Sequence, residues 1–153
     1  DYNGTKTIIE TLGKNEIFYA QTFKSDNNEL SIITQEESRI TLFEYTTMLN
    51  IKPRYQDLQR KMLDNFTQII IDKLNQNMER IQILTKKTIR EKLLAYFQNE
   101  AKKHHRKVFK LNLSLTDLAD YLAIDRSAMM REIKHLKEDR IIIIEKKRVT
   151  LLV

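Results

Sequence analysis

Residues 114–139 read SLTDLADYLAIDRSAMMREIKHLKED. Ser114 is a candidate N-cap, and Asp117 three residues later makes a capping-box-like arrangement. After a short break over 123–125, Asp125 is a second candidate N-cap, for a helix over 126–138. Apolar residues recur at helical spacing in both segments: Leu115, Leu118, Ala119 and Leu122 in the first, and Met129, Met130, Ile133 and Leu136 in the second. The stretch therefore predicts two helices joined by a tight turn.

The residues that follow predict a β-hairpin. The runs over 140–145 and 148–152 are rich in β-branched residues, and Lys146-Lys147 stands between them as the hairpin tip. Helix, break, helix and hairpin in this order have the spacing of a winged helix-turn-helix. In that arrangement the first helix braces the second, which presents its N-terminal residues to base edges in the major groove. Lys146, Lys147 and Arg148 at the tip would suit contacts to phosphates.

Three cations share one broad face of the second helix. With about 100° of rotation per residue, Arg126, Arg131 and Lys134 fall within one sector, and Ser127 and Met130 lie on or beside it. Arginine pairs bidentately with guanine. Cations on an isolated helix most often form a solvated face, but the spacing, the hairpin and the local charge together favour a helix that reads DNA.

The charge is unevenly distributed along the chain. There are 27 basic and 21 acidic residues, a formal net charge of +6. Residues 1–85 hold ten Lys/Arg against twelve Asp/Glu, whereas 86–153 hold 17 against nine, so the C-terminal part alone carries +8. Excess positive charge confined to one part indicates a polyanionic partner, either nucleic acid or an anionic membrane surface.

A long uninterrupted helix is predicted over 54–84, after Pro53 in a position that a first helical turn tolerates. Its apolar residues recur every three or four positions: Leu58, Met62, Phe66, Ile69, Ile70, Leu74, Met78, Ile81 and Leu84. So long a stripe needs a cover, either a second copy paired as a coiled coil, which we prefer, or another domain. A further helix is predicted over 88–103.

Short strands are predicted in the N-terminal part, over 7–12, 17–20, 30–34 and 39–43, with turn-forming residues between them. Four short strands are few for a closed sheet, so we expect them to complete a sheet whose earlier strands are absent. Strands followed by helices and a hairpin predict an α+β fold.

The composition excludes several kinds of site. The chain has no cysteine, which rules out disulfides, thiolate metal sites and cysteine-held iron–sulfur clusters within it. Gly4 and Gly13, the only glycines, cannot form a phosphate loop. A solvated basic end or a phosphate contact is favoured over a metal site at His104-His105. We expect no enzyme activity, no cofactor and no metal, and a cytoplasmic protein. No apolar run approaches the roughly 18 residues of a membrane span, so we expect no membrane-spanning segment.

Residues 114–152 resemble the winged helix-turn-helix of the Crp–Fnr transcription regulators, most specifically in the runs DLADYL and DRSAMMREIKHLKED. The family order implies the last part of a cyclic-nucleotide-binding-like β-roll effector domain over 1–52, a dimerisation helix over 53–85 and the DNA-binding domain over 86–153. The resemblance also implies an N-terminally incomplete chain of a bacterial homodimer, with double-stranded DNA and RNA polymerase as partners. Dimerisation would use Leu58, Met62, Phe66, Ile69, Ile70, Leu74, Met78 and Ile81.

The resemblance implies roles for individual residues. Arg126, Ser127 and Arg131 match base-reading positions, and Lys134 and Ser114 match positions that face phosphates. Ser127 stands where members similar to the cyclic-AMP receptor carry Glu, so an accepting contact to cytosine is lost and the operator is expected to differ. The whole expected DNA-contacting set is Ser114, Arg126, Ser127, Met130, Arg131, Lys134, Lys146, Lys147 and Arg148.

Two other departures from the family pattern matter. Ala123 stands where many members have a glycine in the turn, so either its backbone is mildly strained or the turn differs. Members that bind cyclic nucleotide carry a Gly-Glu pair and an Arg-Ser or Arg-Thr pair. The corresponding stretches here, 18–20 and 28–31, read FYA and NELS and offer no cation to a cyclic phosphate. An effector other than cyclic AMP, of unknown identity, is therefore predicted.

Two functions of different class follow from this reading. The main one is a homodimeric, sequence-specific DNA-binding transcription regulator. The alternative is a winged-helix docking module whose basic face meets an acidic protein partner without specific DNA binding, because a fold alone does not fix a function. Affinity for duplex DNA at physiological salt, compared between a specific and a random sequence, separates the two.

Overall fold

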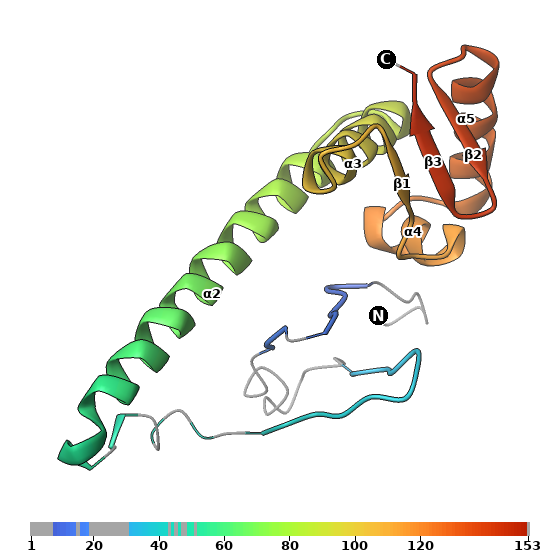
Figure 1. Cartoon of the computed structure of the whole chain (residues 1–153). Helices are drawn as coiled ribbons and strands as arrows, with labels where there is room; N and C mark the ends of the chain where they lie inside the picture. The colour runs from blue at the N-terminus through green and yellow to red at the C-terminus, as the bar shows by residue number, and fades with distance from the viewer. Residues whose placement is uncertain are drawn as a thin grey trace. The chain divides into compact units, whose positions relative to one another are not determined.

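The structure is a computed structural model. It describes residues 8–14, 16–18, 31–42, 44, 46, 49–50 and 52–152 of the 153-residue chain (Figure 1). The chain divides into two compact units, one formed by Leu12–Asn77 and the other by Met78–Val153 together with Asp1–Thr11. Every strand found among the described residues belongs to the second unit.

The second unit combines helices with a small sheet. Its elements follow in the order α3 (Ile89–Lys103), β1 (Val108–Lys110), α4 (Leu115–Leu122), α5 (Arg126–Glu138), β2 (Ile142–Glu145) and β3 (Arg148–Leu151), after the end of helix α2 (Gln56–Leu84). The three strands form one antiparallel sheet in the order β1-β3-β2. The α+β class predicted from the sequence is confirmed, as are the helices over 88–103, 114–122 and 126–138 and the hairpin with its tip at 146–147.

One contiguous apolar core holds α3, α4, α5 and the sheet together. Its side chains with no exposed surface are Leu93, Phe97, Leu118, Leu122, Met129, Leu136 and Val149. Burying one large apolar side chain contributes about 1.5–3 kcal/mol, so several such side chains from each helix are enough to fix its rotation. The core therefore sets which face of α5 points to solvent.

Side-chain caps begin the three helices of this unit. The predicted N-caps Ser114 and Asp125 are confirmed, since their side chains accept from the backbone N–H groups of Asp117 and Ala128 at 3.1 and 2.8 Å. At α3, Thr88 and Glu91 form a full capping box that the sequence reading overlooked. The sequence signal for this capping box was Thr88 followed by Glu91 three residues later.

The same three helices end on non-glycine residues in the left-handed conformation. His105, Ala123 and Arg140 have φ values of 50°, 51° and 56°. Each stands where glycine is the usual residue of a Schellman motif. The bonds that close these motifs run from Arg106 N to Ala101 O, Ile124 N to Ala119 O and Ile141 N to Leu136 O, at 3.0–3.1 Å. For Ala123 the first alternative, a strained residue with positive φ, is thus correct.

Helix α2 is the long helix predicted over 54–84. It begins at Gln56 because Pro53–Tyr55 form the tighter turn η2. Its apolar stripe is largely unburied, and Leu58, Leu74, Met78 and Ile81 are 54%, 58%, 57% and 54% exposed. Only Ile83, at the end that belongs to the second unit, is buried.

The strands predicted over 7–12, 17–20, 30–34 and 39–43 are wrong in those of their residues that the structure describes, which form no strand. The large apolar side chains Ile32, Ile33, Ile40 and Leu42 are 48–78% exposed. A β-branched segment becomes a strand only when a neighbouring backbone takes up its hydrogen bonds and a core covers one face. The described residues of these segments belong to no sheet, and these four side chains are not covered by a core. The other positions of the predicted strands lie outside the described residues.

Candidate nucleic-acid interface

Helix α5 turns one face to the core and the opposite face to solvent. Met129, Ile133 and Leu136 are at most 2% exposed, whereas Met130 is 41% exposed. The α5 residues predicted to contact DNA all lie on the solvent side; they are Arg126, Ser127, Met130, Arg131 and Lys134. The amphipathic periodicity read from the sequence therefore gave the correct rotation of this helix.

The first turn of α5 is tied together by its cap. The Asp125 carboxylate accepts from the Ala128 N–H at 2.8 Å and from the Ser127 hydroxyl at 2.6 Å, both at Oδ1. The hydrogen bond from Ser127, followed by the one from Ala128, lowers the pKa of Asp125. Asp125 is therefore ionised at neutral pH and holds the Ser127 side chain in one direction.

Helix α4 packs against α5 through its buried apolar face, and a short turn joins the two helices. Leu118 and Leu122 have no exposed surface. At the start of α4 the Ser114 hydroxyl accepts from the Asp117 N–H and donates to the Asp117 carboxylate at 2.7 Å. The capping box is therefore modified, because the carboxylate takes the hydroxyl proton. Ser114, a predicted phosphate contact, is half-buried and already uses its hydroxyl within α4.

The tip of the β2–β3 hairpin presents exposed cations. Lys146, Lys147 and Arg148 are all exposed, and Lys146 has a φ of 55°. In a two-residue hairpin such positive φ values favour Asn and Gly, so a lysine is held here in a strained backbone position. Figure 1 shows the β2–β3 turn at the end of the unit where α4 lies.

Strand β1 adds a cation that the sequence reading missed. Lys110 lies directly opposite Arg148 in the β1–β3 register. The Leu111 N–H also donates to the Lys147 carbonyl at 2.7 Å, which ties the end of β1 to the hairpin tip. The signal for this strand was a period of two, because Phe109 and Leu111 are buried whereas Lys110 is exposed.

One arginine of α3 pairs with two carboxylates, one in α5 and one at its C-cap. The Arg90 guanidinium pairs with Glu132 at 3.3 Å and with Asp139. The hydrogen bond to Asp139 raises the pKa of Arg90. Glu132 lies in α5 and Asp139 is its C-cap, about two turns further along, so one arginine holds the helix at two points. On the cationic face of α5, Lys134 pairs with Glu138 at 3.7 Å.

The adjacent histidines at the end of α3 serve different structural purposes. The His104 ring is stacked on Phe109, with centroids 6.1 Å apart and an interplanar angle of 8°. His105 occupies the left-handed position of the Schellman motif. Within the described residues, no group of three or more His, Asp or Glu side chains could hold a metal ion.

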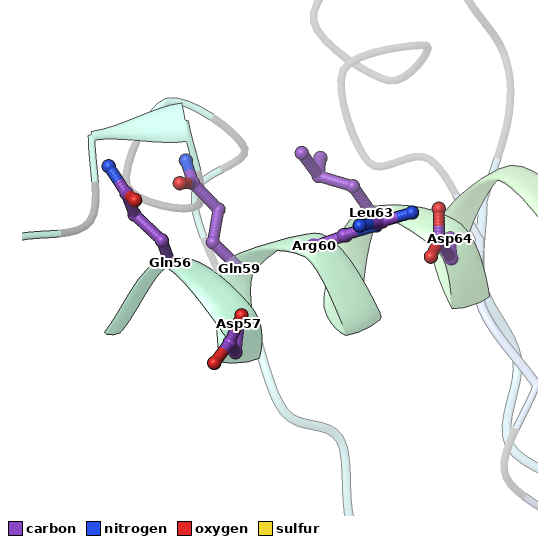
Figure 2. Close-up of a pocket in the computed structure, with 6 residues that line it drawn as sticks. All are labelled: Gln56, Asp57, Gln59, Arg60, Leu63 and Asp64. Atoms are coloured by element: carbon purple, nitrogen blue, oxygen red, sulfur yellow. The ribbon is translucent and has the colours of Figure 1, made fainter. Parts of the chain in front are cut away.

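An open depression runs along the first turns of α2, in the other unit. It is lined by one helix alone, by Gln56, Asp57, Gln59, Arg60, Leu63 and Asp64. Figure 2 shows Gln56 and Gln59 extending from one side of the helix and Asp57 from the other. Side chains that diverge from a single helix do not converge on a ligand, so this depression is not a candidate site.

The predicted DNA contacts thus gather on one unit, on α5, on the β2–β3 hairpin and, for Ser114, at the start of α4. The predicted dimer contacts lie along α2. No protein-family model matches the chain, and a search of curated proteins finds no match. None of the helices in the described part of the chain is long and apolar enough to cross a membrane. The class defined by fold and site is an α+β unit with a cationic helix face and a cationic hairpin.

Proposed function

We propose that the chain is a homodimeric, sequence-specific DNA-binding transcription regulator of the Crp–Fnr type, in which 86–153 form a winged helix-turn-helix. The orientation of α5 carries the proposal. Its apolar face is buried, and Arg126, Arg131 and Lys134 lie on its exposed face. A helix of 13 residues is about 20 Å long, and the major groove, about 12 Å wide, admits an α-helix.

The β2–β3 hairpin would act as the wing. Its tip cations Lys146 and Lys147 are exposed, and Arg148 is paired in register with Lys110. Cations held on a strained turn away from the reading helix suit phosphate contacts, which position a protein on DNA without specifying sequence. This division assigns base reading to α5 and most of the salt-dependent affinity to the hairpin.

Helix α2 would be the dimerisation helix. The exposed stripe that includes Leu58, Leu74 and Met78 would be covered by a second copy. Two α5 helices related by a twofold axis predict a near-palindromic operator with half-sites about 34 Å apart. The effector part over 1–52, an effector other than cyclic AMP and a contact with RNA polymerase stay predictions from the resemblance. The effector argument rests on the stretches 18–20 and 28–31, of which 19, 20 and 28–30 lie outside the described residues.

A selection of duplexes from a random pool, followed by affinity measurements at physiological salt, tests the proposal. We expect the chain to select a near-palindrome and to bind it on the order of a thousandfold more tightly than random DNA. Arg126→Ala and Arg131→Ala should relax the base preference, since each removes a guanidinium from the exposed face of α5. If Arg131→Ala leaves the discrimination unchanged, the base-reading role of Arg131 is wrong.

The docking-module alternative predicts another outcome of the same experiment. Specific and random duplexes would then bind weakly and equally, because an acidic protein surface and not DNA would be the partner of the basic face. That result would overturn the DNA-reading function and leave the description of the fold unchanged.

A further inference from the structure

The proton of the Ser127 hydroxyl is used in a hydrogen bond within the first turn of α5. It donates to Asp125 Oδ1 at 2.6 Å. An ionised carboxylate only accepts hydrogen bonds, so the direction of this bond is fixed by chemistry. Ser127 is exposed, and the hydroxyl oxygen keeps its acceptor capacity toward solvent. At this position the protein therefore offers an acceptor and no donor.

Asp125 is well placed to keep this arrangement in a complex. It is the N-cap of α5, and the same Oδ1 accepts from the Ala128 N–H at 2.8 Å. The cap bond fixes the carboxylate to the helix backbone. A charge-assisted bond from the hydroxyl is stronger than one between neutral groups, so turning the Ser127 proton toward DNA would exchange a strong bond for a weaker one.

The major groove distinguishes bases by the groups they present there. Cytosine presents its N4 amino group and adenine its N6 amino group, whereas the O6 of guanine and the O4 of thymine are acceptors. An acceptor-only side chain on the helix that enters this groove can pair with the amino group and not with the carbonyls. The acceptor-only hydroxyl of Ser127 thus selects bases that present an amino group, cytosine and adenine.

We propose that Ser127 reads the exocyclic amino group of a cytosine or an adenine, and that Asp125 sets this preference by holding the hydroxyl proton. The inference rests on the proposed function, since it presupposes that α5 enters the major groove. It corrects the expectation that serine at this position loses the accepting contact. The contact is retained, with a shorter side chain and a hydroxyl in place of a carboxylate.

Base analogues provide the test. The operator position read by Ser127 is the one at which Ser127→Ala relaxes the selected base. Replacing the adenine there by purine, or the cytosine by 2-pyrimidinone, deletes the amino group alone. We expect this deletion to weaken binding of the unaltered chain by roughly threefold to tenfold, the range of one hydrogen bond, and to leave binding by Ser127→Ala unchanged. Equal loss in both proteins, or no loss in either, would overturn the inference.

Asp125→Ser is the matched variant. Serine also caps a helix, but its hydroxyl can donate as well as accept, so it no longer forces the Ser127 proton away from the groove. We expect Asp125→Ser to accept guanine or thymine at that position as readily as cytosine or adenine. A chain that selects no sequence would refute the proposed function itself. A chain that selects an operator but ignores the amino group refutes only this inference.

Discussion

The Cζ atom of Arg80 in α2 lies 4.3 Å from the centroid of the Tyr121 ring in α4. The same guanidinium donates through Nη2 to the carbonyl oxygens of Tyr121, at 3.2 Å, and of Ile8. Burial lowers the pKa of Arg80, and its Nε is buried without a hydrogen-bond partner among the described residues. One side chain therefore joins the end of α2 to α4, the helix that supports α5.

Arg80→Ala should lower the free energy of unfolding by about 1–3 kcal/mol, because it removes a partly desolvated cation–π contact and the hydrogen bonds to two carbonyls. Denaturant unfolding measures the change. Tyr121→Phe is the control, since it keeps the ring face and the backbone carbonyl that Arg80 contacts. Unchanged stability of Arg80→Ala, or an equal loss in Tyr121→Phe, would show that this contact does not stabilise the unit.

Ala123→Gly should stabilise the unit. Ala123 has a φ of 51° at the end of α4, a conformation that costs an L-residue with a Cβ about 1 kcal/mol and glycine almost nothing. For a domain of this size, about 1 kcal/mol corresponds to a rise of about 4–8 °C in Tm.

The control for this prediction is an ordinary helical alanine. Ala95 lies within α3, where glycine lowers stability by about 1 kcal/mol. We expect Ala95→Gly to lower the Tm and Ala123→Gly to raise it in the same thermal melts. Two changes of the same sign would mean that the turn after α4 does not hold Ala123 in the left-handed region.

The cap of α5 should make stability depend on acid pH. The hydrogen bonds from Ser127 and Ala128 lower the pKa of Asp125 in the folded state. A lowered pKa stabilises the folded state above the pKa of the unfolded chain, about 3.9, and this contribution is lost as the pH falls through the lower folded value. Asp125→Asn keeps a cap that does not titrate.

Unfolding free energies of the two proteins between pH 7 and pH 2 measure this effect. The advantage of the unaltered chain over Asp125→Asn should be present at pH 7 and shrink progressively below about pH 4. A difference that is constant over the whole range would mean that the Asp125 charge contributes nothing to folding.

The parts of the fold predicted correctly are those that local chemistry specifies. The caps at Ser114 and Asp125 gave the starts of α4 and α5, and the period of Met129, Ile133 and Leu136 gave the rotation of α5. Each of these signals acts within one or two helical turns. The tip at 146–147 followed from two β-branched runs with a two-residue gap. Local patterns of this kind require no knowledge of distant partners.

The errors occurred where a partner distant in sequence decides the outcome. Strand β1 pairs with β3, with Lys110 opposite Arg148. The alternation of its three residues is too short to predict a strand without that distant partner. The strands expected before residue 44 have the right residue types, but their described residues belong to no sheet, and residue type alone does not supply the neighbouring backbone that a strand requires. The contact of Arg80 with Tyr121 likewise joins two segments 41 positions apart.

The exposed stripe of α2 predicts a self-association that one charge should disrupt. Leu74 is 58% exposed, and in a coiled coil it would lie in the apolar seam. Leu74→Asp should convert a dimer into a monomer in sedimentation experiments, because two buried like charges would face each other. Affinity for a two-half-site operator should then fall on the order of a hundredfold.

The control places the same charge on the other side of the helix. Gln76 is exposed and lies about 200° round α2 from Leu74, so Gln76→Asp should remain dimeric. A chain that sediments as a monomer without any substitution, or a Leu74→Asp variant that stays dimeric, would refute pairing through this stripe.

Lys146→Gly should change stability and DNA affinity in opposite directions. Lys146 has a φ of 55°, so glycine should stabilise the unit by about 1 kcal/mol. The same change removes a cation from the hairpin tip, which should weaken the binding of all duplexes alike and reduce the slope of log K against log salt by about one.

Lys146→Ala separates the two effects of Lys146→Gly, since it loses the charge but keeps the strained backbone. Its affinity should fall as far as that of Lys146→Gly, while its Tm does not rise. If both variants bind DNA like the unaltered chain, the strained lysine is not a phosphate contact and the hairpin is not the wing.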